Sequence, residues 1–346
     1  MTELTYFAGL DVAVKKTAIC IVDNTNTIVA EGKVPTDPEA IERYLQSRAP
    51  MLARVGLEAG QMSDWLALEL MGKGLPAVCV EARHAHGFIS SQINKNDRND
   101  ARGLARMMMC GVFKPVHVKS AESQFNRALL GSRKLLSDKL VDLEHHIRGT
   151  LVSFGRPIGS CTRATFPHRV SELIDDDTTL AGIIMPLLVT RDMLQDQLEH
   201  AHHHVMSIAR GDPVCELLMT APAVGPVTAL TFKTFVDDPG RMRGRNSIGA
   251  LFGMTPRQHQ SGEREWFGEI SKFGSEDMRM ALCQAGLKIL VNVKTPSVLR
   301  EWGKQIEARR GRNTAAVAVG RRLGEILLRM WREERAFNPA GAAQTA

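Results

Sequence analysis

The chain has 346 residues, of which 44% are hydrophobic and 24% charged, and its formal net charge is +6 at pH 7. This length is enough for two domains with a core each. All apolar runs are shorter than the roughly 18 residues of a membrane span, and no signal peptide is recognised. Six scattered cysteines without CxxC spacing predict free thiols. We therefore expect a cytoplasmic protein without a membrane partner, and the positive charge is compatible with a polyanionic partner.

Residues 1–115 are predicted to form an α/β domain. Short apolar runs, two of them separated by the turn residues 23–26, predict a meander of three strands, after which strands alternate with helices. This order is the one expected of an RNase H-like fold, in which the first and fourth strands carry carboxylates at the middle of the sheet. The predicted strands are 4–11, 17–23, 27–34, 53–58 and 76–81, and the predicted helices are 38–47, 62–73 and 97–110.

The rest of the chain is predicted to be mainly helical. Leucine and isoleucine recur at spacings of three and four over 122–150, and a second helical run covers 178–209, so residues 116–211 are predicted to form a coiled-coil arm or linker. Residues 212–346 form the third predicted domain. It contains a turn at 221–229 that is either of the helix-hairpin-helix type, with its backbone close to a phosphate, or a tight turn between packed helices. Closing helices are predicted at 275–292, 297–309 and 313–335.

Four acidic residues lie where a carboxylate is costly unless it has a role. Asp11 interrupts one apolar run and Glu58 ends another, while Asp97 and Asp100 stand three apart at the start of a predicted helix and so share a helix face. If the strands face that helix, the four carboxylates converge and repel each other unless a divalent cation neutralises them. Oxygen ligands suit Mg²⁺ or Mn²⁺. Taken singly, each could instead be a solvated or helix-capping carboxylate.

Short motifs in a fixed order resemble those of one family over roughly residues 4–335. The family shows GID-A, EATG and KTD-DA, which correspond here to GLDVA (9–13), LEAG (57–60) and KNDRNDA (95–101). Further along it shows PGIG--TA, G-TP----SG and ISK-G---LR, which correspond here to three later segments. These segments are 221–229, 253–262 and 270–279. The chain resembles the DEDD transposases of insertion sequences, which include Piv-type invertases and bridge-RNA-guided recombinases.

The resemblance implies a composite active site. Its first half is a RuvC-like cluster of Asp11, Glu58, Asp97 and Asp100 that binds Mg²⁺ or Mn²⁺. Two such ions roughly 3.5–4 Å apart can stabilise both the attacking and the leaving oxygen of a phosphodiester. Its second half is Ser261, the position of the family's nucleophile, which forms a 5′-phosphoserine link to DNA. Serine is a poor nucleophile at neutral pH and needs activation.

The chain departs from the family pattern at two places, and neither departure affects the four carboxylates or Ser261. Residues 60–62 replace the usual TG-Y, and Ala223 stands where glycine is common.

Basic residues of the third domain are predicted to contact nucleic acid. Arginines lie in a loop that follows the candidate turn and recur near the last helix, where they suit sequence-independent contacts to phosphate, although a solvated basic face is the alternative. The predicted contact residues are Arg241, Arg243, Arg245, Arg257, Lys272, Arg309, Arg310, Arg312, Arg321 and Arg322.

The family resemblance also implies the partners. They are double-stranded donor and target DNA, a structured bridge RNA encoded with the element, and further copies of the chain in a homodimer or homotetramer. Such a protein is expected to associate with the nucleoid while it acts.

Three other functions remain open on the sequence alone. A metal-dependent nuclease or Holliday junction resolvase would use the carboxylates without a covalent intermediate. A sugar-kinase-like ATPase would use Gly9 to Asp11 ahead of Lys15, with a second phosphate loop near Pro239. A non-catalytic nucleic-acid-binding arm protein is the third, and the clustered carboxylates argue against it.

Overall fold

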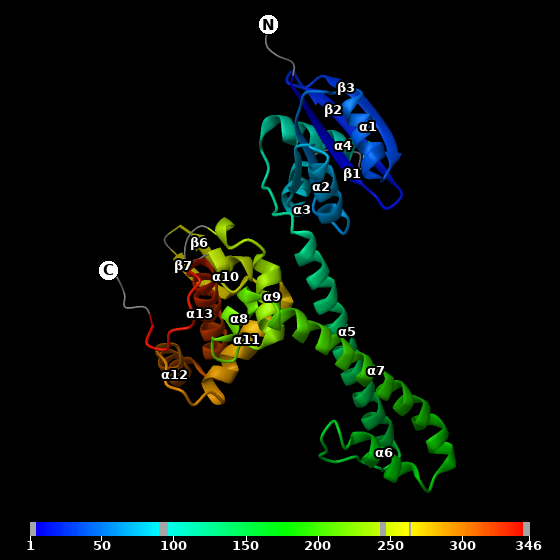
Figure 1. The fold of residues 1–346 in the computed structure, drawn as a ribbon, viewed down its shortest axis with the longest axis vertical. Coiled ribbons are helices and arrows are strands. Elements are labelled where there is room, and N and C mark those ends of the chain that lie inside the picture. The colour runs from blue at the N-terminus through cyan, green and yellow to red at the C-terminus, as the bar shows by residue number, and fades with distance from the viewer. Residues whose placement is uncertain (1–4, 90–95, 243–246, 263, 342–346) are drawn as a thin grey trace. The chain divides into compact units, whose positions relative to one another are not determined.

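The computed structural model describes residues 5–89, 96–242, 247–262 and 264–341. The chain divides into two compact units, Met1–Gln124 and Phe125–Ala346 (Figure 1). The predicted finer division into domains 1–115, 116–211 and 212–346 stays a prediction. None of the described helices has an apolar stretch long enough to cross a membrane.

The first unit is built on a mixed five-stranded sheet. β1 lies at its centre, antiparallel to β2 and parallel to β4, and the strand order is β3-β2-β1-β4-β5. This α/β arrangement is compatible with the predicted RNase H-like fold. The strands are β1 (Tyr6–Val12), β2 (Lys16–Asp23), β3 (Ile28–Pro35), β4 (Leu52–Glu58) and β5 (Ala77–Val80).

Helices cover both faces of this sheet because its side chains alternate between two apolar cores. Ala8, Leu10, Ile19 and Ile21 pack in one core with α1 and α2, while the core on the opposite face, which contains Ala18, includes α4 residues. The helix predicted over 97–110 is confirmed, and α3 was not predicted. The helices are α1 (Pro38–Gln46), α2 (Ser63–Gly72), α3 (Ala82–Ile89) and α4 (Asp97–Cys110).

Glycines let α4 lie directly on the sheet. A Cβ atom added to Gly9 of β1 would stand 2.2 Å from the carbonyl oxygen of Ala101 and 2.3 Å from the backbone nitrogen of Ala105. On β4, a Cβ at Gly56 would stand 2.6 Å from Cγ of Met108. The close approach of α4 therefore depends on the absence of side chains at these positions, and it brings the start of α4 next to the ends of β1 and β4.

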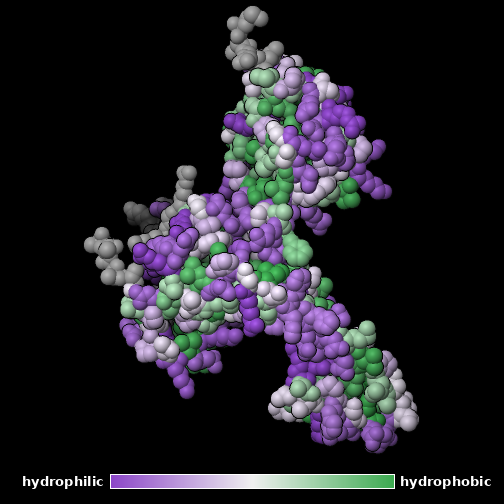
Figure 2. All heavy atoms as spheres, viewed as in Figure 1, coloured by the Kyte–Doolittle hydropathy of each residue, from purple (hydrophilic) through white to green (hydrophobic). Residues whose placement is uncertain are grey.

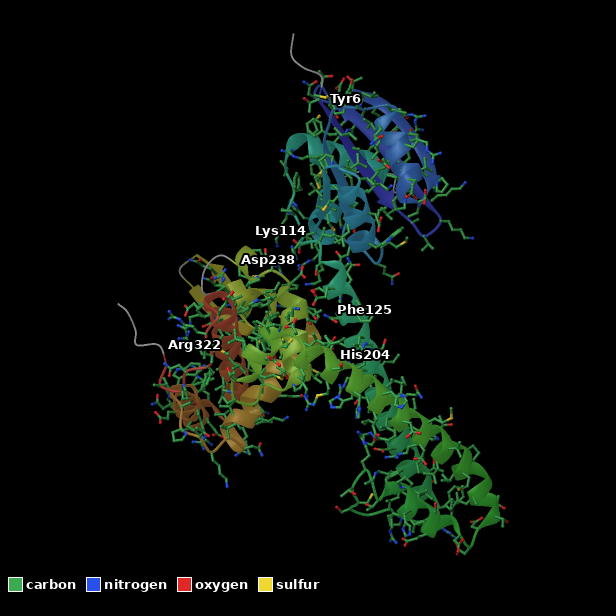
Figure 3. The ribbon with its side chains drawn as sticks, in the orientation of Figure 1. Tyr6, Lys114, Phe125, His204, Asp238 and Arg322 are labelled. Atoms are coloured by element: carbon green, nitrogen blue, oxygen red, sulfur yellow. The ribbon has the colours of Figure 1, made fainter. Side chains whose placement is uncertain are left out.

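Two long helices, α5 (Ala121–Ser153) and α7 (Thr178–Arg210), are joined through the short helix α6 (Phe166–Ile174), and all but the first turn of α5 belongs to the second unit. The predicted helices at 122–150 and 178–209 are confirmed, but α6 lies in a stretch for which no helix was predicted. Near one end of the pair, the rings of Phe125 and His204 meet edge to face with centroids 6.1 Å apart (Figure 3). Near the other, Leu151, Phe166 and Ile184 share a buried core.

The remaining helices of the second unit pack around a separate apolar core, which contains Phe232 and Phe252. The three predicted closing helices are confirmed as α11, α12 and α13. The elements are α8 (Pro213–Met219), α9 (Pro226–Val236), the 3₁₀ turn η1 (Pro239–Arg241), α10 (Ser247–Leu251), α11 (Glu276–Val291), α12 (Val298–Arg310) and α13 (Arg312–Glu333).

A β-hairpin that was not predicted interrupts these helices. It consists of β6 (Pro256–Ser261) and β7 (Arg264–Ile270) in antiparallel pairing. Residues 256–261 contain no β-branched residue and only polar side chains after the proline, so strand propensity did not reveal them.

Candidate functional site

Asp11 and Glu58 lie on the sheet face that α4 covers. Side chains two apart on a strand share a face, so Asp11 follows Gly9 toward α4 and Glu58 follows Gly56. Leu10 of β1 and Leu57 of β4 are paired in register. The two carboxylates come directly after this pair, at neighbouring ends of adjacent parallel strands.

Asp97 and Asp100 occupy the first turn of α4. The cap of this helix is Asn96, whose side-chain oxygen accepts a hydrogen bond from the backbone N–H of Asn99 at 2.9 Å. Capping therefore does not account for Asp97 or Asp100. Both instead add negative charge at the end of the helix where its dipole is positive.

Three of the acidic side chains act electrostatically on the fourth, Asp11. The pKa of Asp11 is raised to about 6, first by burial and then by the charges of Asp97, Asp100 and Glu58. In the described part of the chain, however, no three His, Cys, Asp or Glu side chains are arranged as metal ligands. Binding a metal would therefore require some of these side chains to move.

One oxygen of the cluster lacks a partner. Oδ1 of Asp100 is buried and has no hydrogen-bond partner among the described atoms. A buried carboxylate oxygen without a donor is unfavourable, and a cation would satisfy it. This orphaned oxygen and the raised pKa of Asp11 both fit the divalent metal that the family resemblance implies.

Basic side chains that were not predicted border the carboxylates. Lys33 of β3 forms an ion pair with Asp97, with 2.5 Å between Nζ and Oδ2, and this contact lowers the pKa of Asp97. Glu31 accepts from Arg98 Nε at 2.8 Å and from a terminal nitrogen of Arg102 at 2.9 Å. These contacts hold the pKa of Glu31 at about 2, with Arg102 as the main cause. Alternation along β3 could have pointed to Glu31 and Lys33 as a pair on one face.

Ser261 is the last residue of β6, and it pairs with Arg264 of β7. The following Gly262 has a φ of 60°, in the left-handed region that suits a tight turn. The serine thus stands at the tip of the hairpin. Its side chain lies outside the part of the chain that the structure describes.

The turn before α9 contains one of the two departures from the family pattern. Ala223 has a φ of 61°, which a residue with a Cβ adopts at a cost and glycine adopts freely. This conformation is the physical reason that glycine is common at the position. Whether the turn contacts phosphate stays a prediction.

The basic residues that were predicted to contact nucleic acid differ in whether they interact with other groups of the protein. Arg241 is half-buried and donates to the carbonyl oxygens of Val236 and Phe235, so part of its guanidinium holds the end of α9. Arg243 and Arg245 lie outside the described residues. Of the others, Arg309 and Arg310 are exposed at the end of α12, Arg257 donates to the carbonyl of Ser271, and four form ion pairs. The pairs are Lys272 with Glu269, Arg312 with Glu307, and both Arg321 and Arg322 with Glu325.

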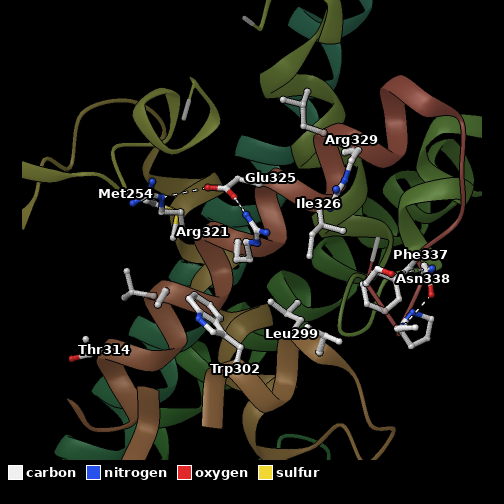
Figure 4. Close-up of a pocket in the computed structure, with 18 of the residues that line it drawn as sticks. Met254, Leu299, Trp302, Thr314, Arg321, Glu325, Ile326, Arg329, Phe337 and Asn338 are labelled. Carbon is white, nitrogen blue, oxygen red and sulfur yellow. Dashed lines mark hydrogen bonds and ion pairs between the residues drawn. The ribbon is translucent and has the colours of Figure 1, made fainter. Parts of the chain in front are cut away.

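A groove of about 2020 Å³ lies in the second unit between α12, α13 and the segment 337–341. Trp302 and Leu299 of α12, Arg321 of α13 and Phe337 line it (Figure 4). Arg321 is about one third exposed and pairs with Glu325 at 3.6 Å. The groove combines arginines with an exposed aromatic ring, a combination that suits a nucleic-acid strand.

Two sequence profiles match the chain. A DEDD transposase profile of the IS110 type matches residues 8–155, which include all four carboxylates, and the profile "Transposase IS116/IS110/IS902 family" matches residues 215–301, which include Ser261. The chain belongs to the IS110-type DEDD transposases of insertion sequences. Members of these families are enzymes that cleave and join DNA, so the protein is a DNA transposase.

Several curated transposases are similar over most of their length. The transposase of insertion sequence element IS1111A from Coxiella burnetii is 26% identical over 92% of this chain and 87% of its own. A probable family 20 transposase from Pseudomonas aeruginosa is 23% identical over 96% of this chain and 98% of its own. The transposase of element IS1328 from Yersinia enterocolitica is 23% identical over 83% and 85%. These matches do not favour the alternative of a nuclease or junction resolvase.

Proposed function

We propose that this transposase cuts and rejoins DNA with a composite site made of the four carboxylates and Ser261. The observation that carries the proposal is the raised pKa of Asp11 on the sheet face under α4, where burial and then the charges of Asp97, Asp100 and Glu58 disfavour its ionised form. A carboxyl whose pKa is raised by burial and by neighbouring carboxylates is typical of a functional site.

Asp11, Glu58, Asp97 and Asp100 would hold Mg²⁺ or Mn²⁺. When bound, the metal would supply charge neutralisation at the phosphate oxygens and activation of the serine hydroxyl. The residues themselves would orient the phosphodiester, and the buried Oδ1 of Asp100, which has no hydrogen-bond partner among the described atoms, would be one of the oxygens that hold the ion. Lys33 and the arginines on α4 would lie beside the DNA backbone.

The serine reaction is balanced without ATP. The oxygen of Ser261 would attack the phosphorus and lose its proton, the bond to the 3′ oxygen of the DNA would break, and the 3′ oxygen would gain one proton in exchange. The product is a 5′-phosphoserine ester and a free 3′ hydroxyl. Attack by a 3′ hydroxyl of another strand would then restore a phosphodiester and release the serine. This sequence requires the second unit to meet a first unit, from the same chain or from a partner.

The nucleic-acid partners would be donor and target DNA together with a structured guide RNA encoded beside the element. Exposed arginines at the end of α12 and along the groove would contact phosphates without reading sequence. The guide RNA is supported by the family resemblance, and sequencing RNA that copurifies with the protein tests it directly. Absence of a discrete, element-encoded RNA from an active preparation would contradict this part of the proposal.

The test of the serine is a covalent adduct. Full-length protein is incubated with Mg²⁺ and DNA that carries a label on the strand bearing the 5′ phosphate, and the products are run on a denaturing gel. We expect a labelled protein–DNA adduct with the wild type and none with Ser261→Ala or Asp11→Ala. Ser160→Ala, at an exposed loop serine, is the matched control and should form the adduct normally.

The two mechanisms differ in this assay. DNA cleavage by the wild type without any adduct would favour a nuclease that uses the carboxylates alone. Recombination by purified Ser261→Ala protein would rule out the serine as nucleophile.

A further inference from the structure

Lys33 reaches the acidic cluster from a distant part of the sequence. It lies on β3, 64 residues before Asp97, and its ammonium nitrogen stands 2.5 Å from Oδ2 of that carboxylate. Its charge also opposes the rise in the pKa of Asp11. The ammonium thus acts on two of the four carboxylates, so it partly neutralises the cluster.

The surroundings of Lys33 direct it to this cluster. Glu31, two residues earlier on the same strand face, is already engaged by Arg98 and Arg102. The Lys33 side chain is 48% exposed and that of Asp97 is 56% exposed. A lysine ammonium is a compact charge on a flexible stem, and at this exposure it can leave Asp97 without disturbing the core.

We propose that Lys33 is a positioning residue of the strand-transfer site, whose ammonium stands at Asp97 in the place of a divalent cation and moves to a DNA phosphate when the cation binds. The inference rests on the proposed acidic metal site and adds a role for a residue outside it. A cation among the carboxylates would repel the ammonium and compete for Asp97. A phosphodiester nearby would attract it.

The first test is the affinity for Mn²⁺ in the absence of DNA. Mn²⁺ is titrated into full-length protein, with free Mn²⁺ measured by electron paramagnetic resonance. Loss of a competing positive charge should tighten Mn²⁺ binding by Lys33→Gln about three- to tenfold, and Lys33→Arg, which keeps the charge, should not show this gain. Lys73→Gln is the control because Lys73 also pairs with carboxylates, Glu39 and Glu42, but on elements that cover the opposite face.

The second test is binding of DNA in the presence of metal. Lys33→Gln should weaken binding of a duplex in Mn²⁺ by severalfold and reduce its dependence on salt, whereas Lys73→Gln should not. Tighter Mn²⁺ binding together with weaker DNA binding is the expected signature of Lys33→Gln.

The outcomes separate this inference from the proposed function. If Asp11→Asn abolishes Mn²⁺ binding but Lys33→Gln binds Mn²⁺ as the wild type does or more weakly, Lys33 does not compete with the cation and the inference is overturned. If Asp11→Asn leaves Mn²⁺ binding unchanged, the acidic metal site itself is wrong and the role of Lys33 is lost with it.

Discussion

At the scale of single residues, the negative charges that the proposed function requires lower the stability of the fold. Asp11 is partly buried beside three other carboxylates, and its pKa is raised to about 6. A raised pKa means that the folded state holds this proton more tightly than the unfolded state. The stabilisation from Asp11 is therefore full below about pH 4 and is lost as pH rises through 6.

Removing this charge should stabilise the metal-free protein. We expect Asp11→Asn to raise the free energy of unfolding of the first unit by about 1 kcal/mol at pH 7.5, after allowance for solvent screening. The gain should shrink toward pH 4, where the wild-type carboxyl is protonated. Amide hydrogen exchange of β1 and β4 in EDTA across a urea series measures it. A gain that is the same at both pH values would contradict the assigned pKa.

At the scale of elements, the site depends on how closely α4 lies against β1. Gly9 has no room for a Cβ, because the backbone of α4 stands where the atom would be. The two carboxylates on α4 and the one on β1 belong to elements that meet at this contact. A change that separates the helix from the strand should therefore affect the acidic cluster as well as the core.

We expect Gly9→Ala to destabilise the first unit by about 2–4 kcal/mol, because the backbone of α4 must shift to admit the methyl group. Mn²⁺ affinity should fall in the same variant. Gly72→Ala in α2 is the matched control, since a Cβ there meets nothing within 4 Å, and it should be neutral or slightly stabilising. Urea unfolding and Mn²⁺ titration of both variants provide the measurement, and equal stability of the two would show that α4 does not pack as described.

At the scale of the whole molecule, the arm presents an apolar surface. Met185, Val189 and Met193 of α7 are 46%, 57% and 64% exposed, and their spacing of four places them on one helix face. We refer to these three residues as the α7 stripe. Figure 2 shows apolar side chains gathered over this part of α7. Exposed apolar stripes on helices are typical of surfaces that pair with another helix, and we propose that a second copy of the transposase covers it.

Val189→Glu should therefore shift the protein toward the monomer by at least tenfold in the dissociation constant, since a charge would be buried at the helix pair. Mass photometry over a dilution series measures the shift. Val291→Glu, at a valine of similar exposure (52%) in α11, should leave the oligomeric state unchanged. A wild type that is monomeric at all concentrations, or a Val189→Glu variant that assembles normally, would show that the stripe is not the oligomer contact.

Local patterns in the sequence were enough to predict much of the fold and the candidate acidic residues. The strands, the helix at 97–110, the long arm helices and the closing helices follow from alternation and helical spacing, which depend on near neighbours. Asp11 and Glu58 could be found because a carboxylate at the end of an apolar strand is conspicuous in any context. The hairpin of Ser261 could not be seen, because its first strand is polar and its pairing with β7 stabilises it.

Only the tertiary structure decided which side chains surround the acidic residues. The pairing of Lys33 with Asp97, the engagement of Glu31 by Arg98, and the contact of Gly9 with α4 join positions that are more than 60 residues apart in the chain. No periodicity encodes such contacts. They arise because the sheet places β3 and β1 on either side of β2 and the packing of α4 then brings its first turn over the strand ends. The sequence determined which groups carry the charge, and packing determined which charges oppose one another.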